Sequence, residues 1–224
     1  MELSSRTALI ADDDEFFRMA LVTILRSRLG FTDVVETASL DEALDQLANV
    51  QDISVALFDL AMPGMESAAS LAAVREGFPD IRVAVVSGST RRQDILMALE
   101  AGVHGYVPKG LGAAELSQAL RMVLDGSIYV PPSLADVPRS PGESSRAPER
   151  VGPKPDEANL SLTPRQRDVL SLVVEGRSNK EIARSLNLGE GTVKIHLAAL
   201  FRNLGVSTRA GVAATGARLL GPRT

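Results

Sequence analysis

The sequence predicts an α/β domain with a doubly wound, five-stranded parallel sheet, followed by a smaller all-α domain of four helices. Short apolar runs alternate with helical patterns over roughly the first half of the 224-residue chain, the order expected of a parallel sheet covered by helices. Seven of the 12 prolines then fall within residues 131–159. Only helical periodicity follows that segment.

The five expected strands are short apolar runs with the length of buried strands. They lie at residues 8–11, 34–37, 53–58, 82–87 and 105–107. The helical patterns lie at residues 15–29, 40–49, 65–77, 91–101 and 112–125. The first helix is expected to carry Phe16, Ala20, Thr23 and Ile24 along one face.

The proline-rich segment is expected to be an extended linker, because it has too few bulky apolar side chains to offset its ordering entropy. We therefore divide the chain into a first domain at residues 1–130, a linker at 131–159 and a second domain at 160–224. Residues 1–130 hold 10 Lys/Arg and 19 Asp/Glu, a net charge of −9, whereas residues 161–224 hold 10 and 4, a net charge of +6. This asymmetry favours a polyanion as the partner of the second domain, although scatter in surface charge has the same signature.

Several classes of protein are disfavoured. The chain has no cysteine, which excludes disulfides and thiolate chemistry and suits a reducing, cytoplasmic location. With only two histidines, His104 and His196, a zinc site is not expected. No apolar run approaches the roughly 20 residues that span a bilayer, and no basic region precedes the first apolar stretch, so neither a membrane span nor a signal peptide is expected.

Polar side chains gather where the expected strands end. Residues 12–14, all aspartate, follow the first strand, Asp59 follows the third, Ser87 ends the fourth, and Lys109 follows the fifth. Because ligands of doubly wound sheets bind at the carboxyl ends of the strands, these side chains should meet at one edge. Each alone has a simpler explanation, since Asp14, for example, could cap the next helix. Agreement among four strand ends favours a functional site.

The residue types at this edge suit phosphoryl chemistry. Crowded carboxylates are held ionised by a divalent cation, and Mg²⁺ is the natural choice for oxygen ligands. Asp59 can then act as a nucleophile toward a phosphoryl group, because carboxylates form acyl phosphates. Mg²⁺ and Lys109 would neutralise charge on the transferring oxygens, and the Ser87 hydroxyl could hydrogen-bond the attached group.

Four segments, LIADDDEFFR, ALFDLAMPGM, VAVVSGS and GYVPKG, resemble the signature segments of bacterial response-regulator receivers over about residues 5–126. The resemblance implies a CheY-like receiver fold and a set of site residues. These are Asp12 and Asp13 as the acidic metal pair, Asp59 as phosphoacceptor and metal ligand, the backbone carbonyl of Ala61 as a further ligand, Ser87 as the switch hydroxyl, Tyr106 as the coupled aromatic and Lys109 as the phosphate-contacting cation.

The second domain carries the cap signals of helices. Thr163 with Gln166, and Ser178 with Glu181, have the spacing of capping boxes. The four helices are expected at about residues 164–175, 179–186, 190–203 and 208–220.

The third of these helices has two unlike faces. The side expected to face the domain core carries an apolar stripe, Val193, Leu197, Leu200 and Leu204. The other side carries Lys194, Ile195, Ala198 and Arg202. This face is expected to be exposed, and an exposed face that mixes cations with one apolar side chain fits a reader of the DNA major groove, in which lysine meets guanine or phosphate and isoleucine meets a thymine methyl. The alternative is a small four-helix interaction module with solvated basic residues, and periodicity alone does not separate the two.

LTPRQRDVL, GRSNKEIARSL and GTVKIHL resemble the LuxR-type helix-turn-helix of the NarL/FixJ response regulators over about residues 161–220. The resemblance implies a set of DNA contacts: Lys194 and Ile195 in the groove, with Lys180, Thr192 and Arg202 near the phosphates. Ala198 stands where some relatives carry a polar or basic base-contacting residue, and Gly189 stands where a capping serine is common.

Together the two resemblances imply a response regulator of a two-component system, in which phosphorylation of Asp59 by a sensor histidine kinase controls sequence-specific DNA binding and transcription. The expected partners are double-stranded DNA, the kinase, RNA polymerase and, after phosphorylation, a second copy of the chain. We expect no enzyme that acts on other substrates, although the receiver would promote phosphate transfer to its own Asp59 and the hydrolysis of that phosphate.

Two alternative functions, an aspartyl phosphatase and an interaction protein with a degenerate receiver, fit the sequence less well. An aspartyl phosphatase would want a second acid two residues after its nucleophile, where this chain has Ala61. A degenerate receiver in an interaction protein would have lost part of the acidic site, which is intact. For the switch, we expect receiver dimerisation to contribute more than release of a tail held against the receiver, and we expect Ser87 and Tyr106 to move inward on phosphorylation.

Overall fold

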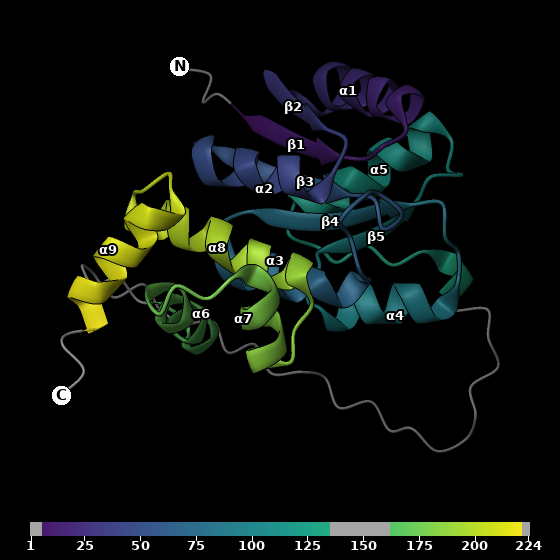
Figure 1. Ribbon diagram of the computed structural model, residues 1–224. Coiled ribbons are helices and arrows are strands. Elements are labelled where there is room, and N and C mark those ends of the chain that lie inside the picture. Colours follow the sequence, from purple (N-terminus) through teal and green to yellow (C-terminus); the bar gives the residue numbers. More distant parts are fainter. Residues whose placement is uncertain (1–5, 135–161, 221–224) are drawn as a thin grey trace.

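We describe the protein from a computed structural model, which places residues 6–134 and 162–220. The first domain has a sheet of five parallel strands in the order β2-β1-β3-β4-β5 (Figure 1). The strands are β1 (Thr7–Ala11), β2 (Asp33–Thr37), β3 (Ile53–Phe58), β4 (Arg82–Ser87) and β5 (Gly105–Pro108). Each matches its expected run to within about one residue at either end, so the predicted doubly wound sheet is confirmed.

Helices cover both faces of the sheet. One face is covered by α1 (Glu15–Leu29) and α5 (Ala113–Leu124). The other is covered by α2 (Leu40–Asn49), α3 (Leu71–Gly77) and α4 (Arg92–Glu100). Strand β3 shows how the sequence builds this arrangement, because Val55 and Leu57 belong to the first core and Ala56 and Phe58 to the second. A continuous apolar run is needed where both faces of a strand are buried.

The buried face of α1 differs from the expected one. Leu21, Ile24 and Leu25 are buried, whereas Ala20 and Thr23 are exposed and Phe16 is 85% exposed. The expectation was therefore wrong except for Ile24. Apolar residues lie on more than one side of this helix, so periodicity did not identify the side that meets the sheet.

Two further segments depart from expectation. The helix expected at 65–77 begins later, with a 3-10 turn at Ala68–Ser70 that leads into α3. Of the expected linker at 131–159, only residues 131–134 are described, and they include a 3-10 turn at Pro132–Leu134. The rest of the linker lies outside the described residues.

The second domain consists, in its described part, of four helices around one apolar core. They are α6 (Pro164–Val174), α7 (Asn179–Leu186), α8 (Glu190–Leu204) and α9 (Arg209–Leu220). Both predicted capping boxes are present, Thr163 with Gln166 and Ser178 with Glu181. The predicted stripe on α8 is also confirmed, because Val193, Leu197 and Leu200 are buried in this core and Leu204 packs against it.

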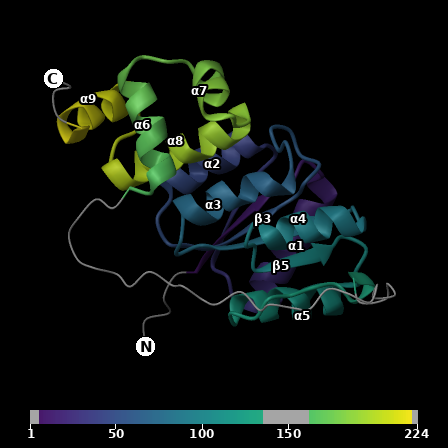
Figure 2. The ribbon, with the colours of Figure 1, turned by 90° about the horizontal axis from the view of Figure 1, so that it is seen from below.

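The two domains meet along α8. This helix lies beside α2 and α3 in both views, whereas α5 lies on the far side of the first domain (Figure 2). Ile195, Ala198 and Ala199 of α8 belong to the same apolar cluster as the α2–α3–α4 side of the sheet. No helix among the described residues is long and apolar enough to cross a membrane.

Candidate functional site

The carboxyl ends of the strands carry the predicted acidic pocket. Asp12 directly follows β1 and is 1% exposed, and Asp59 directly follows β3 and is 3% exposed. Asp13 is exposed beside them. One carboxylate oxygen from each of the three lies within 4.8 Å of the others. This convergence follows from the topology, because β1 and β3 are neighbours in the sheet.

Lys109 joins the two buried carboxylates. Its ammonium group donates to Asp12 Oδ1 at 2.8 Å and to Asp59 Oδ2 at 3.1 Å, and it forms an ion pair with Asp12 Oδ2 at 2.7 Å. Burial alone would lower the pKa of Lys109, but the bonds to both carboxylates outweigh burial and raise it. Burial raises the pKa of Asp12 despite the opposing bond from Lys109. The pocket therefore holds a fixed cation between two carboxyl groups.

The second oxygen of Asp59, Oδ1, is buried and accepts no hydrogen bond from any described residue. Leaving a buried carboxylate oxygen without a donor costs free energy, so such an atom indicates where a ligand binds. Next to Asp59 is a cavity of about 440 Å³ whose lining includes Ala61, Ser87 and Lys109. The clustered carboxylates of Asp12, Asp13 and Asp59 fit a hard cation such as Mg²⁺.

Ser87 and Tyr106 lie at the same edge of the sheet. Ser87 ends β4 and is 2% exposed, and its hydroxyl accepts a hydrogen bond from the Ser89 N–H at 3.3 Å. Tyr106 is fully buried, and its hydroxyl donates to the Ser89 carbonyl oxygen at 2.7 Å. The ring of Tyr106 is thus inward in this structure, and its movement on phosphorylation stays a prediction.

The predicted DNA-reading face of α8 is covered by the first domain. Ile195 is 0% exposed and Ala198 is 4% exposed, although both were expected to face solvent. Gly77 at the end of α3 allows the close approach, since a Cβ there would lie 2.7 Å from the Cβ of Ala199. Burying one isoleucine side chain stabilises a contact by about 1.5–3 kcal/mol. Apolar packing is therefore a large part of what holds the two domains together.

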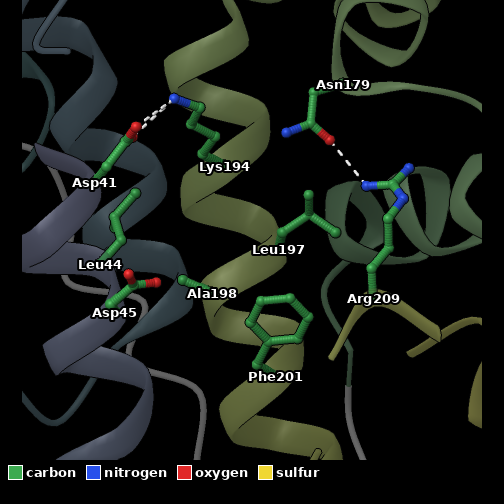
Figure 3. A pocket seen from close by; sticks show the side chains of 9 residues that line it. All are labelled: Asp41, Leu44, Asp45, Asn179, Lys194, Leu197, Ala198, Phe201 and Arg209. Carbon is green, nitrogen blue, oxygen red and sulfur yellow. Dashed lines mark hydrogen bonds and ion pairs between the residues drawn. The ribbon is translucent and has the colours of Figure 1, made fainter. Parts of the chain in front are cut away.

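The cations of the same face are paired with the first domain. The Lys194 ammonium lies 2.8 and 2.6 Å from the two carboxylate oxygens of Asp41 on α2 (Figure 3). Arg202 donates to the Leu47 carbonyl oxygen at 3.3 Å, and its guanidinium lies 5.7 Å from the centroid of the Phe78 ring. The Lys194–Asp41 pair is partly exposed, so it contributes less than about 1 kcal/mol.

Comparisons with known proteins agree with this geometry. The family model described as "Response regulator receiver domain" matches residues 8–121, and the one described as "Bacterial regulatory proteins, luxR family" matches residues 160–215. The glycerol metabolism activator of Pseudomonas putida is 35% identical over 201 residues, 90% of each chain. The nitrate/nitrite response regulator NarL of Escherichia coli K12 is 31% identical over 91% of each chain.

The chain belongs to the two-component response regulators with a LuxR-type DNA-binding domain. A solved LuxR-family response regulator from Aurantimonas sp. SI85-9A1 is 27% identical and has a TM-score of 0.53, over 59% of this chain and 94% of that chain. The response regulator is a transcription regulator, whose receiver implies a histidine kinase as partner and whose second domain implies DNA binding.

In this response regulator the structure brings the predicted receiver residues together at one pocket, including Ala61 in the cavity lining. The predicted DNA contacts differ in their exposure. Lys180 on α7 is exposed and Thr192 is half-buried. The four predicted contacts between positions 194 and 202 are instead held against the receiver.

Sequence reasoning missed the receiver residues that cover α8, above all Asp41, Glu66 and Gly77. One signal pointed toward Glu66. Gly189 stands where a capping serine is common, so the N-terminus of α8 lacks its own side-chain cap. Glu66 of the receiver accepts a hydrogen bond there from the Gly191 N–H at 3.1 Å.

Buried His196 on α8 is expected to make the stability of this response regulator depend on pH. It is 2% exposed, and its Nδ1 has no hydrogen-bond partner among the described residues. Burial lowers the pKa of His196 below the ordinary 6.5, with Glu76 opposing and Arg165 assisting. An unfolded chain takes up a proton below about pH 6.5 that the folded chain does not, so the free energy of unfolding should fall from there downward.

Urea unfolding at pH 7.5 and pH 5.5 checks this expectation. His104 has a lowered pKa as well, again chiefly through burial, so it contributes in the same direction. His196→Gln should reduce the difference between the two pH values but not remove it. An undiminished difference in His196→Gln would show that His196 is not the source.

Proposed function

We propose that phosphorylation of Asp59 controls whether α8 is free to bind DNA. The observation that carries this proposal is the packing of the DNA-reading face of α8 onto the receiver, with Ile195 fully buried and Lys194 bonded to Asp41. A DNA duplex and the receiver cannot occupy the same face at once. The unphosphorylated chain would therefore not bind DNA through α8 until the two domains separate.

The pocket supports phosphoryl transfer to Asp59. Its Oδ1 is buried and accepts no hydrogen bond from the described residues, so it is available to attack phosphorus. Lys109 is in place to neutralise the transferred group, and the Ser87 hydroxyl lines the same cavity. The sensor histidine kinase is the expected donor, and its histidine departs as the new acyl phosphate bond forms.

A metal ion completes this chemistry. Asp12, Asp13, Asp59 and the backbone carbonyl of Ala61 would hold Mg²⁺, which supplies positive charge to the transferring phosphoryl oxygens when bound. The chain's own contribution is to hold the carboxylates together and to keep Lys109 charged beside them.

The packing of α8 against the receiver bears on which of two switching mechanisms comes first, receiver dimerisation or release of the second domain. The sequence favoured receiver dimerisation over release of the tail, but the covered face of α8 favours release as the first step. A homodimer on paired half-sites then follows naturally, because a single small unit makes few base contacts. Recruitment of RNA polymerase would come after DNA binding.

A binding titration tests the proposed function. Full-length chain is titrated into a pool of random-sequence duplex DNA, with and without Mg²⁺ and acetyl phosphate, at several salt concentrations. We expect tighter binding with the phosphodonor, and affinity that falls with salt because cations on the second domain displace counterions. No binding under any condition would favour the interaction-module alternative.

Replacing Asp13 by alanine should weaken Mg²⁺ binding by about tenfold or more, at least the effect of losing a residue that supports a metal ligand. Because Asp13 shares the site with two other carboxylates, its removal also relieves repulsion, so the metal-free variant should be no less stable than wild type. Mg²⁺ titration followed by calorimetry, with thermal unfolding alongside, measures both effects. Glu100→Gln is a suitable control, because Glu100 is exposed at the end of α4. Unchanged Mg²⁺ affinity in Asp13→Ala would show that the metal does not bind at Asp13.

A further inference from the structure

The N-terminus of α8 differs from those of α6 and α7. Thr163 and Ser178 cap α6 and α7 with their own side chains, whereas Gly189 at the N-cap of α8 has no side chain to offer. The first N–H groups of a helix need acceptors from elsewhere. Here the acceptor is Glu66 Oε1 of the receiver, 3.1 Å from the Gly191 nitrogen.

The fit of Glu66 depends on two glycines. A Cβ on Gly189 would overlap the Glu66 carboxylate, and a Cβ on Gly191 would lie 3.0 Å from the Gly64 carbonyl oxygen. Any side chain at position 189 would therefore displace Glu66 or push α8 away. Gly189 therefore leaves α8 without a cap of its own and also leaves the space that the Glu66 carboxylate occupies.

Glu66 belongs to the loop that begins at the phosphoacceptor, seven residues after Asp59. Met62 of this loop is buried, and the Pro63 carbonyl oxygen accepts a hydrogen bond from the Leu40 N–H at 2.9 Å. The loop is thus anchored between the pocket and the start of α2. A change at Asp59 or at the Ala61 carbonyl has a short covalent path to Glu66.

The Tyr106 route offers less movement. Its ring is fully buried and bonded to Ser89 in this structure, which leaves little room for an inward swing. A path through the loop at 59–66 needs no such swing.

We infer that Glu66 is an interdomain N-cap, which occupies the position of a DNA phosphate at the N-terminus of α8 and is withdrawn when the pocket at the start of its own loop is phosphorylated. Helix N-termini bind phosphate groups through the same free N–H groups and the positive end of the helix dipole. The inference rests on the proposed function and adds to it the contact that connects the two sites.

A single introduced thiol reports the closed state without DNA. The chain has no cysteine, so Ala198→Cys places one thiol beneath the receiver, and its rate of maleimide labelling measures how often α8 is uncovered. In this background Glu66→Ala should raise the labelling rate about fivefold, the size of effect typical of losing an N-cap. Gly189→Ser should raise it about tenfold or more, because its side chain collides with Glu66.

The double variant decides the matter. With Glu66 already alanine, the three atoms closest to a Cβ at position 189 are gone and the serine provides its own cap, so Gly189→Ser should change labelling by less than about twofold. Gly112→Ser is the matched control, since Gly112 is also an N-cap glycine but a Cβ there would be no closer than 3.9 Å to its nearest neighbour. Equal effects of Gly189→Ser with and without Glu66, or no effect of Glu66→Ala, would overturn the inference.

Phosphodonor treatment separates this inference from the proposed function. Mg²⁺ and acetyl phosphate should raise labelling of the wild-type Glu66 chain, and the rise should be smaller in Glu66→Ala because the contact is already lost. An equal rise in both would refute the coupling through Glu66 while leaving the proposed function intact. If labelling does not respond to the phosphodonor in any chain but the glycine and glutamate variants behave as expected, the proposed function and the withdrawal of Glu66 both fail, and only the interdomain cap contact stands.

Discussion

An Asp59→Asn chain is expected to incorporate no phosphoryl group from acetyl phosphate and Mg²⁺, whereas wild type gains one. The amide is not a nucleophile toward phosphorus under these conditions, and Asp12, the other buried carboxylate of the pocket, is held by Lys109. Intact-protein mass measured under acidic conditions, which preserve acyl phosphates, checks the result.

The fold should survive this change. Asp59 is one of several crowded carboxylates, so its neutralisation relieves repulsion, and Lys109 keeps its bonds to Asp12. Asp125→Asn, at the exposed end of α5, serves as the matched control and should be labelled like wild type. Equal labelling of the Asp59→Asn and wild-type chains would sink the assignment of the phosphoacceptor.

Gly77→Leu is expected to raise the DNA affinity of the unphosphorylated chain by tenfold or more. A Cβ on Gly77 would already lie 2.7 Å from the Cβ of Ala199, so a leucine forces α3 and α8 apart. If the closed form is about 99% of the population, full opening raises the apparent affinity by about 100-fold, because apparent affinity scales with the competent fraction. Titration of the unphosphorylated chain into duplex DNA measures the change.

Ala72→Leu is the control for added bulk on the same helix. Ala72 lies on α3 but is exposed, so its leucine should leave DNA binding unchanged. Combining Gly77→Leu with Asp59→Asn should give a chain that binds DNA without any response to phosphodonor. Affinity in Gly77→Leu no higher than in Ala72→Leu would show that the covered face of α8 does not limit DNA binding.

The acidic pocket was predictable because each strand, and the residue that follows it, can be recognised from its own short stretch of sequence. Parallel strands bring their carboxyl ends to one edge, so residues that end β1, β3, β4 and β5 must meet whatever the details of packing. The strand boundaries and the helix caps are similarly local. The sequence was sufficient for the positions of Asp12, Asp59 and Lys109.

The domain contact was not predictable in the same way. Whether Ile195 and Ala198 face solvent, DNA or another domain depends on which surfaces of α2 and α3 remain after the receiver has folded. Helical periodicity identifies the side of α8 that faces its own core but not what covers the opposite side. The same limit explains the error on α1, where apolar residues lie on more than one side of the helix and the sheet selects among them.

Under the proposed function one face of α8 both binds DNA and packs against the receiver, which limits how this regulator can acquire new operators. A change of base preference usually requires a larger or more polar side chain on the reading helix, yet Ile195 and Ala198 are also packed against the receiver. Such a substitution would change the DNA affinity of the unphosphorylated chain as well as the DNA sequence that is recognised. New specificity should therefore evolve through paired substitutions, one on α8 and one on the facing surface of α2 or α3.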